Sequence, residues 1–298
     1  MRFLAAVTFT IIAALTSFAQ NDCGLASIDF AELNTSNQFK ASPDTIGLIK
    51  QKEVSGIVRS IKYPGHFWAI NDSGNGAVLY LYSIADASIR GLFILRNVSN
   101  TDWEDLSIDN NGIIYIPDFG DNDAKREAYT IFKIPEPDFG QPESKINEIT
   151  ADVERIRFTY KNGARDAEAF AFDPVDRVSY IISKREKNVF VYPLPLEKSD
   201  STLILEPIGN LPFSNVVAAD FSSDGMKFML KTYTNIYLWG RESADESFCN
   251  TISRVPENVS YQLEPQGESL CFMEDSFITV SEERFGLQPW LYYYPSSN

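Results

Sequence analysis

WEDLS at residues 103–107 is one of four stretches that begin a short apolar strand with a glutamate. The other three are EVSGI (53–57), AEAFAF (167–172) and GESLCF (267–272). Glu53 and Glu104 are 51 positions apart, and Glu168 and Glu268 are 100 positions apart, which is two steps of 50. A period of this length with one carboxylate per repeat predicts a β-propeller, because propeller repeats place equivalent residues around a shared axis.

Short runs of β-branched and aromatic residues, separated by turn residues, follow each of these starts and indicate strands. The third repeat ends with TLILEPI (202–208). A further repeat lacks the glutamate but keeps the pattern from VVAADFSSDG (216–225) to TISRVPEN (251–258). No long segment has the apolar period of a helix, so we expect an all-β chain.

The last repeat ends after PWLYYYP (289–295) and is one strand short. An N-terminal strand within DTIGLIKQ (44–51) would complete it and remove an exposed sheet edge. We therefore predict a single β-propeller of five blades with four antiparallel strands each, and six blades are the alternative. The second repeat is longer than the others by about fourteen residues, and we expect this insertion around EPDFGQPESKINE (136–148). A flat β-sandwich is the main competing fold, but it does not explain the period.

The N-terminal sequence and the composition indicate where the protein is located and which classes of partner suit it. MRFLAAVTFTIIAALTSFA (1–19) reads as a signal peptide, which leaves residues 20–298 as one secreted, extracellular domain. The chain has a net charge of −15, and loss of Arg2 with the signal peptide makes it −16. Nucleic acid and anionic membranes are therefore poor partners, since phosphate contact needs clustered basic residues. Cations, a mineral surface, basic extracellular proteins or a small ligand suit this charge better, and we expect a monomer.

Three cysteines suit an oxidising compartment with one intrachain disulfide. Cys271 lies in the apolar run SLCF, so we expect it to be buried and predict that Cys23 pairs with Cys249. Sequons predict a glycoprotein, and the acceptor residues are Asn34, Asn97 and Asn258. A fourth sequon, at Asn71, lies among candidate site residues and is the weakest of the set.

The repeated acids predict a metal site in the central channel. The inner strand of each propeller blade follows the channel, so Glu104, Glu168 and Glu268 should converge there. In the first repeat, EVSGI can place either Glu53 or Ser55 at this position. In the fourth repeat the position falls on Ala218, with Asp220 two residues later. Carboxylates and a hydroxyl suit calcium, the expected cofactor; the alternative is that the glutamates cap backbone N–H groups or pair with lysines and arginines.

A second group of polar residues follows the second strand of each repeat, so these residues should lie on one rim of the ring. Its candidate ligand-binding members are Asp72, Asp118, Asp121, Asn122, Arg126, Arg185, Lys231 and Glu282. Arg126, Arg185 and Lys231 could hold a phosphate group above a metal ion. Salt bridging between blades is an equally good interpretation of any single residue.

Other chemistries have little support in the sequence. There is one histidine, His66, within the strand-like HFWAI, and no G-x-S-x-G motif for a serine hydrolase. No P-loop or paired cysteine motif is present, which argues against nucleotide-binding P-loop proteins and zinc sites. Acids are plentiful, but no spacing singles out a pair for glycoside hydrolysis.

The order of the motifs resembles a group of secreted, largely uncharacterised β-propeller proteins. The resemblance rests on VSGI, NDSGN, WEDLS with YIPDFGDN, EAFAF with IISKRE, DFSSDG with MLKTY, and GESLCF with TVSEE, and covers most of residues 50–285. More distantly, the strand starts resemble the calcium-activated apyrases, five-bladed propellers that bind calcium in the central tunnel and hydrolyse nucleotides. That likeness implies calcium ligands at Ser55, Glu104, Glu168 and Glu268. A serine of the apyrase pattern is replaced here by Ala218.

The sequence therefore predicts a secreted, acidic, calcium-binding β-propeller that acts in extracellular binding or matrix association. The alternative is a calcium-dependent phosphohydrolase acting on nucleotides or other phosphate esters. In that case Glu168 or Asp118 would hold the metal or water, and Arg126 and Arg185 would hold phosphate. The catalytic residues of such an enzyme are not identifiable from the sequence.

Overall fold

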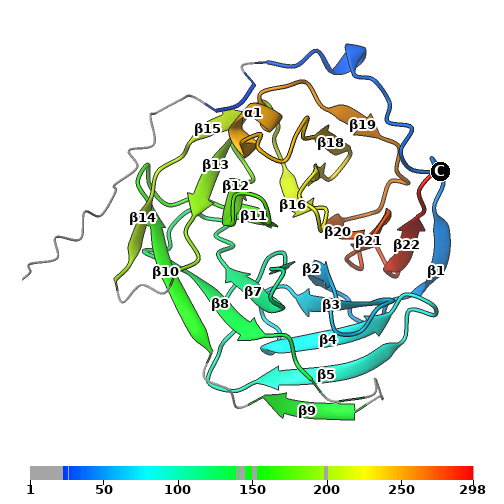
Figure 1. The fold of residues 1–298 in the computed structure, drawn as a ribbon. Coiled ribbons are helices and arrows are strands. Elements are labelled where there is room, and N and C mark those ends of the chain that lie inside the picture. The colour runs from blue at the N-terminus through cyan, green and yellow to red at the C-terminus, as the bar shows by residue number, and fades with distance from the viewer. Residues whose placement is uncertain are drawn as a thin grey trace, which may run out of the picture.

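The computed structural model describes residues 23–25, 27–138, 140, 145–149, 153–197 and 201–297. In this part of the chain, five β-sheets stand around a central axis as the blades of a propeller (Figure 1). The prediction of five blades of four antiparallel strands is confirmed, and the six-bladed alternative is wrong. The signal peptide predicted for residues 1–19 lies outside the described residues.

In each of the first four blades, four antiparallel strands follow one another outward from the central channel in chain order. The first blade contains β2 (Val54–Arg59), β3 (His66–Asn71), β4 (Val78–Ser83) and β5 (Ile89–Leu95). The second contains β6 (Ser107–Ile108), β7 (Ile113–Asp118), β8 (Tyr129–Pro135) and β10 (Glu154–Tyr160). The third contains β11 (Ala167–Asp173), β12 (Val178–Ser183), β13 (Val189–Leu194) and β15 (Gly209–Leu211). The fourth contains β16 (Val216–Phe221), β17 (Lys227–Thr232), β18 (Ile236–Gly240) and β19 (Glu257–Val259).

The fifth blade joins the two ends of the chain. It contains β20 (Gly267–Met273), β21 (Ser276–Ser281), β22 (Trp290–Tyr294) and β1 (Asp44–Leu48). β1 pairs antiparallel with β22, and Leu48 lies opposite Trp290. The predicted closing strand within residues 44–51 is therefore confirmed, and it closes the ring by pairing an N-terminal strand with a C-terminal one.

Two outer strands differ from the prediction. β9 (Lys145–Ile149) comes from the predicted insertion of the second repeat, but it pairs in parallel with β5 of the first blade. β14 (Leu203–Leu205), expected within the fourth strand of blade three, instead pairs in parallel with β10 of blade two. β15 then takes the fourth place in blade three. Each added strand covers the outer edge of a neighbouring blade, which would otherwise carry unpaired backbone groups.

The segment TISRVPEN (251–258) is not the continuous strand that we expected. α1 (Phe248–Ile252) occupies its first part, and β19 supplies the fourth strand of the blade. The hydroxyl of Ser247 accepts a hydrogen bond from the backbone N–H of Asn250 and so caps the helix. Phe248 and Ile252, one turn apart, are both buried against blades three and four. This packing favours a helical turn over an extended strand.

The hydrophobic core is divided among the five spaces between neighbouring blades. Between blades one and two, Trp68 packs with Trp103, and between blades five and one, Cys271 packs with Ile57 and Phe67. The burial expected for Cys271 is confirmed. Because each blade buries one face against each neighbour, the ring is held together without a central apolar core, and its channel can carry polar side chains.

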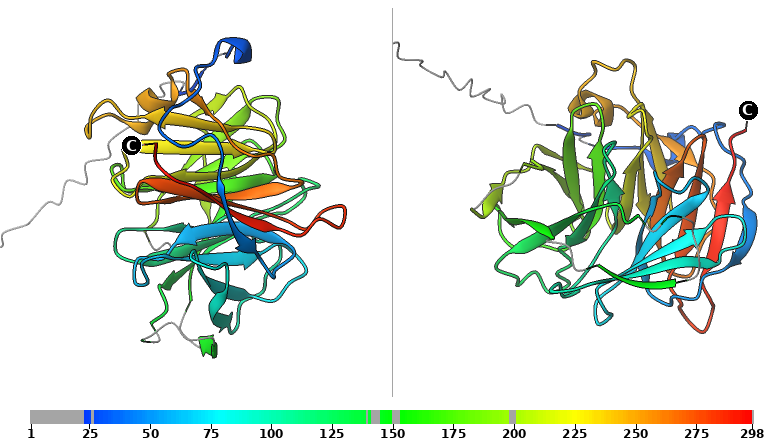
Figure 2. Two further views of the ribbon diagram at one scale, coloured as in Figure 1. Left: turned by 90° about the vertical axis from the view of Figure 1, so that its right-hand side faces the viewer. Right: turned by 60° about the horizontal axis from the view of Figure 1, so that its bottom comes forward.

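The described residues from 23 to 43 form a belt around the outside of blades three, four and five (Figures 1 and 2). Cys23 pairs with Gly209 on blade three, Thr35 pairs with Asn258 on blade four, and Phe39 pairs with Ser296 next to blade five. A short 3-10 helix, η1 (Phe30–Glu32), lies within the belt.

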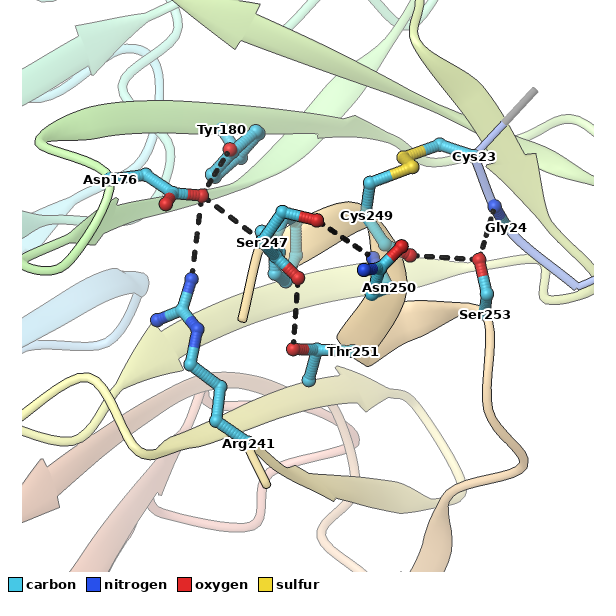
Figure 3. Close-up of a disulfide and its surroundings, with 11 residues drawn as sticks. Cys23, Gly24, Asp176, Tyr180, Arg241, Ser247, Cys249, Asn250, Thr251 and Ser253 are labelled. Atoms are coloured by element: carbon cyan, nitrogen blue, oxygen red, sulfur yellow. Dashed lines mark hydrogen bonds and ion pairs between the residues drawn. A yellow bond between two sulfur atoms is a disulfide. The ribbon is translucent and has the colours of Figure 1, made fainter. Parts of the chain in front are cut away.

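A disulfide between Cys23 and Cys249 fixes the start of the belt to α1, as Figure 3 shows, and the predicted pairing is confirmed. The belt therefore has a covalent anchor on blade four in addition to its backbone pairs. None of the helices in the described residues is long and apolar enough to cross a membrane.

Candidate functional site

Irregular pairing at the start of the inner strands determines which side chains face the channel. The register between the first two strands of a blade shifts around Ser55, Glu168, Val217 and Glu268, which marks a β-bulge at equivalent positions in blades one, three, four and five. In blade two, Glu104 lies in the gap between the bridge at Trp103 and the pair at Ser107. Bulges re-aim side chains and occur next to functional sites.

This register shows which residues of blades one and four occupy the position equivalent to Glu168 and Glu268. Ser55, rather than Glu53, holds the inner position of blade one. In blade four the equivalent residue is Val217, so the assignment of Ala218 is wrong by one residue. Ala218 instead packs between blades four and five. The bulge adds one residue that a regular alternating pattern does not reveal.

The inner positions do not all remain available for a ligand. The hydroxyl of buried Ser55 donates a 2.7 Å hydrogen bond to the carbonyl oxygen of Trp103, which joins blade one to blade two. Val217 offers no polar group. The carboxylates of Glu104, Glu168 and Glu268 are the remaining members, and all three are buried.

An internal cation occupies one side of the channel. The Lys184 ammonium, which follows β12, forms an ion pair with Glu168 and lies 4.0 Å from an oxygen of Glu268. Tyr233 donates a 2.7 Å hydrogen bond to the same Glu268 oxygen. Burial alone would lower the pKa of Lys184, but Glu168, Tyr233 and Glu268 together raise it above its usual value. The lysine therefore stays charged and balances part of the negative charge.

A second group of carboxylates, contributed by blades one and two, has no such cation among the described residues. One oxygen each of Asp72, Asp102 and Glu104 lies within 4.8 Å of the others. Burial raises the pKa of Asp102 to about 7, with a further contribution from the Asp72 carboxylate. Burial, followed by Glu168 and Asp72, raises the pKa of Glu104 well above its usual value. These three side chains form a group that favours either protons or a bound cation.

Glu282 extends the acidic group across the rim of blade five. Its carboxylate accepts a hydrogen bond from Gln266, which also donates to Glu268. Burial, followed by Glu268, raises the pKa of Glu282 to about 9. We refer to this set of carboxylates as the acidic mouth, whose members are Asp72, Asp102, Glu104, Glu168, Glu268 and Glu282.

Several buried oxygen atoms at the acidic mouth have no hydrogen-bond partner among the described residues. They are Oε2 of Glu168, Oε1 of Glu282 and Oδ1 of the neighbouring Asn71. Buried polar atoms are paired in most proteins, and an unpaired one indicates a missing ligand or water. The pairing pattern thus supports a hydrated or ligand-binding channel, independently of the charge.

The rim residues predicted to hold phosphate have protein partners. Arg126 contacts an oxygen of Asp118 at 2.7 Å and the carbonyl of Gly120 at 2.9 Å. The fully buried Lys231 lies 3.3 Å from Glu264, and burial lowers its pKa. Lys231 thus joins blade four to the segment that leads into blade five, as the inter-blade alternative expected, whereas the salt bridge of Arg126 lies within blade two.

Two further rim residues stabilise a loop. The Asp121 carboxylate accepts hydrogen bonds from the backbone N–H groups of Lys125 and Arg126 and from the Tyr129 hydroxyl. Asn122 contacts Arg185, and Arg185 also pairs with Asp166. Arg185, with about half of its side chain exposed, is the most accessible of the three predicted phosphate cations.

Sequence reasoning missed Asp102 and Asp105. Asp102 lies two residues before Glu104 in the same TDWEDLS stretch, and this proximity was the available signal. Asp105 has a backbone φ of 58° and is completely buried. Its carboxylate accepts hydrogen bonds from Leu106, Phe170 and Ala219, on blades two, three and four. Asp105 therefore links three inner strands.

The predicted glycosylation sites differ in accessibility. Asn34 and Asn97 are exposed, whereas Asn258 is half-buried and its side chain contacts Asn235. Asn71 is buried, in agreement with its weak standing as a sequon. Glycosylation at Asn34, Asn97 and Asn258 stays a prediction.

The fold and the acidic mouth define a five-bladed β-propeller with a carboxylate-lined channel entrance. No family model matches the chain, and no curated protein matches it. Among solved structures, the chain is similar to one described as "Crystal structure of Nidogen/Laminin Complex", with a TM-score of 0.47 and 8% sequence identity. The alignment covers 77% of this chain and 72% of that chain. The strand pairing of this chain defines its fold by itself.

Proposed function

We propose that the protein is an extracellular binding module whose acidic mouth holds a calcium ion. The observation that carries the proposal is the convergence of Asp72, Asp102 and Glu104, whose oxygens lie within 4.8 Å of one another. Calcium takes six to eight oxygen ligands in flexible geometry, and carboxylates are its preferred protein ligands. The unpaired oxygens of Glu168 and Glu282 support the same conclusion.

The donor chemistry favours calcium over transition metals. The single histidine, His66, contacts the carbonyl oxygen of Pro64 through its ring and lies in the hairpin at the other end of β3. The free cysteine, Cys271, is buried between blades five and one. Nitrogen and sulfur ligands, which zinc and copper prefer, therefore do not reach the mouth. Calcium bound here would neutralise the group of carboxylates that Lys184 does not reach.

The extracellular setting is supported by the disulfide between Cys23 and Cys249, because such bonds persist in oxidising compartments. The net charge of −15 supports cationic or basic partners and a role in an extracellular matrix or at a mineral surface. A monomer that carries the acidic mouth is sufficient for that role.

Isothermal titration calorimetry tests the calcium proposal. Protein freed of metal with a chelator should bind calcium, and Asp102→Asn should weaken binding at least about tenfold because one charged ligand is lost. Asp123→Asn is the matched control, since Asp123 is exposed and pairs with exposed Lys125. Equal calcium affinity of Asp102→Asn and the control would refute the site, as would the absence of calcium heat.

The phosphohydrolase alternative has weaker support, because Arg126 and Lys231 already have protein partners. Phosphate release from nucleoside di- and triphosphates, measured with calcium and with chelator, separates the two functions. Calcium-dependent release that Asp102→Asn abolishes would replace the binding role by the enzymatic one.

A further inference from the structure

The loop between β21 and β22 carries an unusual concentration of exposed apolar side chains. We call residues 284–290 the rim hairpin. Phe285 is 86% exposed, Leu287 is 56% exposed and Trp290 is 40% exposed, and Leu48 opposite Trp290 is also 40% exposed. Four of the nine exposed large hydrophobic residues in the described part of the chain therefore lie at this one place.

The rim hairpin also projects from the ring. In Figure 2 (left), the orange-red hairpin extends beyond the neighbouring loops. It follows the second strand of blade five, so it lies on the same rim as the acidic mouth. The backbone N–H of Glu283 donates to the carbonyl of Lys52, which fixes the base of the hairpin to the segment before β2.

The tip of the hairpin has a conformation that a phenylalanine does not favour. Arg284 and Leu287 exchange two backbone hydrogen bonds, which leaves Phe285 and Gly286 as a two-residue turn. Both turn residues have positive φ, 55° and 76°. Such turns favour Asn-Gly, because a large side chain in the left-handed region is strained. Phe285 therefore costs stability through its backbone and its exposure, and folding does not explain its presence.

The charges around the hairpin limit what it can contact. Glu282 and the acidic mouth lie beside it, and the chain has a net charge of −15. Lys52 is paired with Glu283, which leaves Arg284 as the cation of the hairpin, with its guanidinium 5.6 Å from the centre of the Phe285 ring. An anionic membrane or a second copy of the chain would place like charges together. A protein surface with an apolar pocket and flanking lysines or arginines would bury the hairpin and face the carboxylates.

We infer that the rim hairpin inserts into an apolar pocket of a basic partner protein, with Phe285 as the central anchor. Binding energy in protein interfaces concentrates in a few apolar and aromatic side chains surrounded by polar groups, which matches Phe285, Leu287 and Trp290 beside the acidic mouth. The inference rests on the proposed binding function and names the class of partner, but it does not require calcium.

Selection from a random peptide library displayed on phage, with the full chain as target, tests the inference. We expect enriched peptides that combine basic and apolar residues. The synthetic peptides should bind Phe285→Asn at least about 30-fold more weakly than the unmodified chain. Phe285→Asn creates a favoured Asn-Gly turn, so its melting temperature should stay equal or rise. Val255→Asn is the control, because Val255 is 62% exposed and lies outside the hairpin.

Several results would overturn the inference. These are a selection without enriched peptides, acidic peptides, or peptides that bind Phe285→Asn as tightly as the unmodified chain. Flotation with phosphatidylcholine vesicles that Phe285→Asn abolishes would assign the hairpin to a membrane instead. A dimer in sedimentation velocity that Phe285→Asn abolishes would assign it to a second copy. Calcium titration of Phe285→Asn should be unchanged, so a failure here is distinguishable from a failure of the calcium site.

Discussion

Asp220 on β16 should make the stability of the protein depend on pH in a way that one substitution removes. Its carboxylate accepts hydrogen bonds from the backbone N–H groups of Phe221 (2.9 Å) and Phe272 (2.8 Å), which joins blades four and five. Burial raises the pKa of Asp220 from 3.8 to about 7, although these hydrogen bonds and Arg59 oppose the shift.

The direction of this pH dependence follows from the linkage between protonation of Asp220 and folding. A raised pKa in the folded state means that the contribution of Asp220 to stability is complete below pH 3.8 and is lost as the pH rises to about 7. A rise of the Asp220 pKa from 3.8 to about 7 corresponds to about 4 kcal/mol in total. About 3 kcal/mol of this falls between pH 5 and 8, because the unfolded carboxyl group is already ionised at pH 5.

Urea unfolding of the unmodified chain and of Asp220→Asn, in chelator at pH 5 and at pH 8, measures this contribution. Relative to the unmodified chain, the variant should gain about 3 kcal/mol in unfolding free energy between the two pH values, because its amide does not ionise. Asp275→Asn is the control, since Asp275 lies in an exposed turn of blade five. Parallel pH profiles for Asp220→Asn and the unmodified chain would refute the reasoning.

Three further variants test other parts of the structure. Arg241→Met should cost about 3–5 kcal/mol in urea unfolding, because it leaves the fully buried Asp173 without its cation; a loss below about 1 kcal/mol would contradict this. Lys184→Met should tighten calcium binding about tenfold in calorimetry and lower the melting temperature in chelator, since it removes the internal cation of the mouth; unchanged affinity would count against the charge argument. Replacement of Cys23 and Cys249 together by serine should lower the free energy of unfolding by about 2–5 kcal/mol, and equal urea midpoints would contradict a stabilising disulfide.

The blade count and ring closure could be predicted from the sequence because they depend on periodicity. The spacing of the glutamates indicated the repeats, and the missing last strand indicated that residues 44–51 close the ring. The partners of β9 and β14 could not be predicted in this way. Their sequences favour strands, but the choice between two exposed blade edges depends on the path of the chain in space.

The candidate site was predictable only in outline. Glu104, Glu168 and Glu268 do lie together at the channel, but a β-bulge moved the blade-four position from Ala218 to Val217. The sequence also gave no sign that Lys231 is fully buried beside Glu264. Charge and spacing indicate which end of a strand a side chain occupies, whereas burial and existing partners decide whether it is available.

The belt has a consequence for the order in which the ring assembles. β1 can pair with β22 only when the C-terminal strand has formed. Without other contacts, this pairing would close a loop of nearly the whole chain, at a correspondingly large entropic cost. Cys23, however, contacts blade three and is bonded to α1 in blade four, so these links can form before blade five is complete. The belt then acts as a short tether that keeps β1 at high effective concentration beside its future partner. Ring closure then requires closure of a short loop rather than of nearly the whole chain, which lowers its entropic cost.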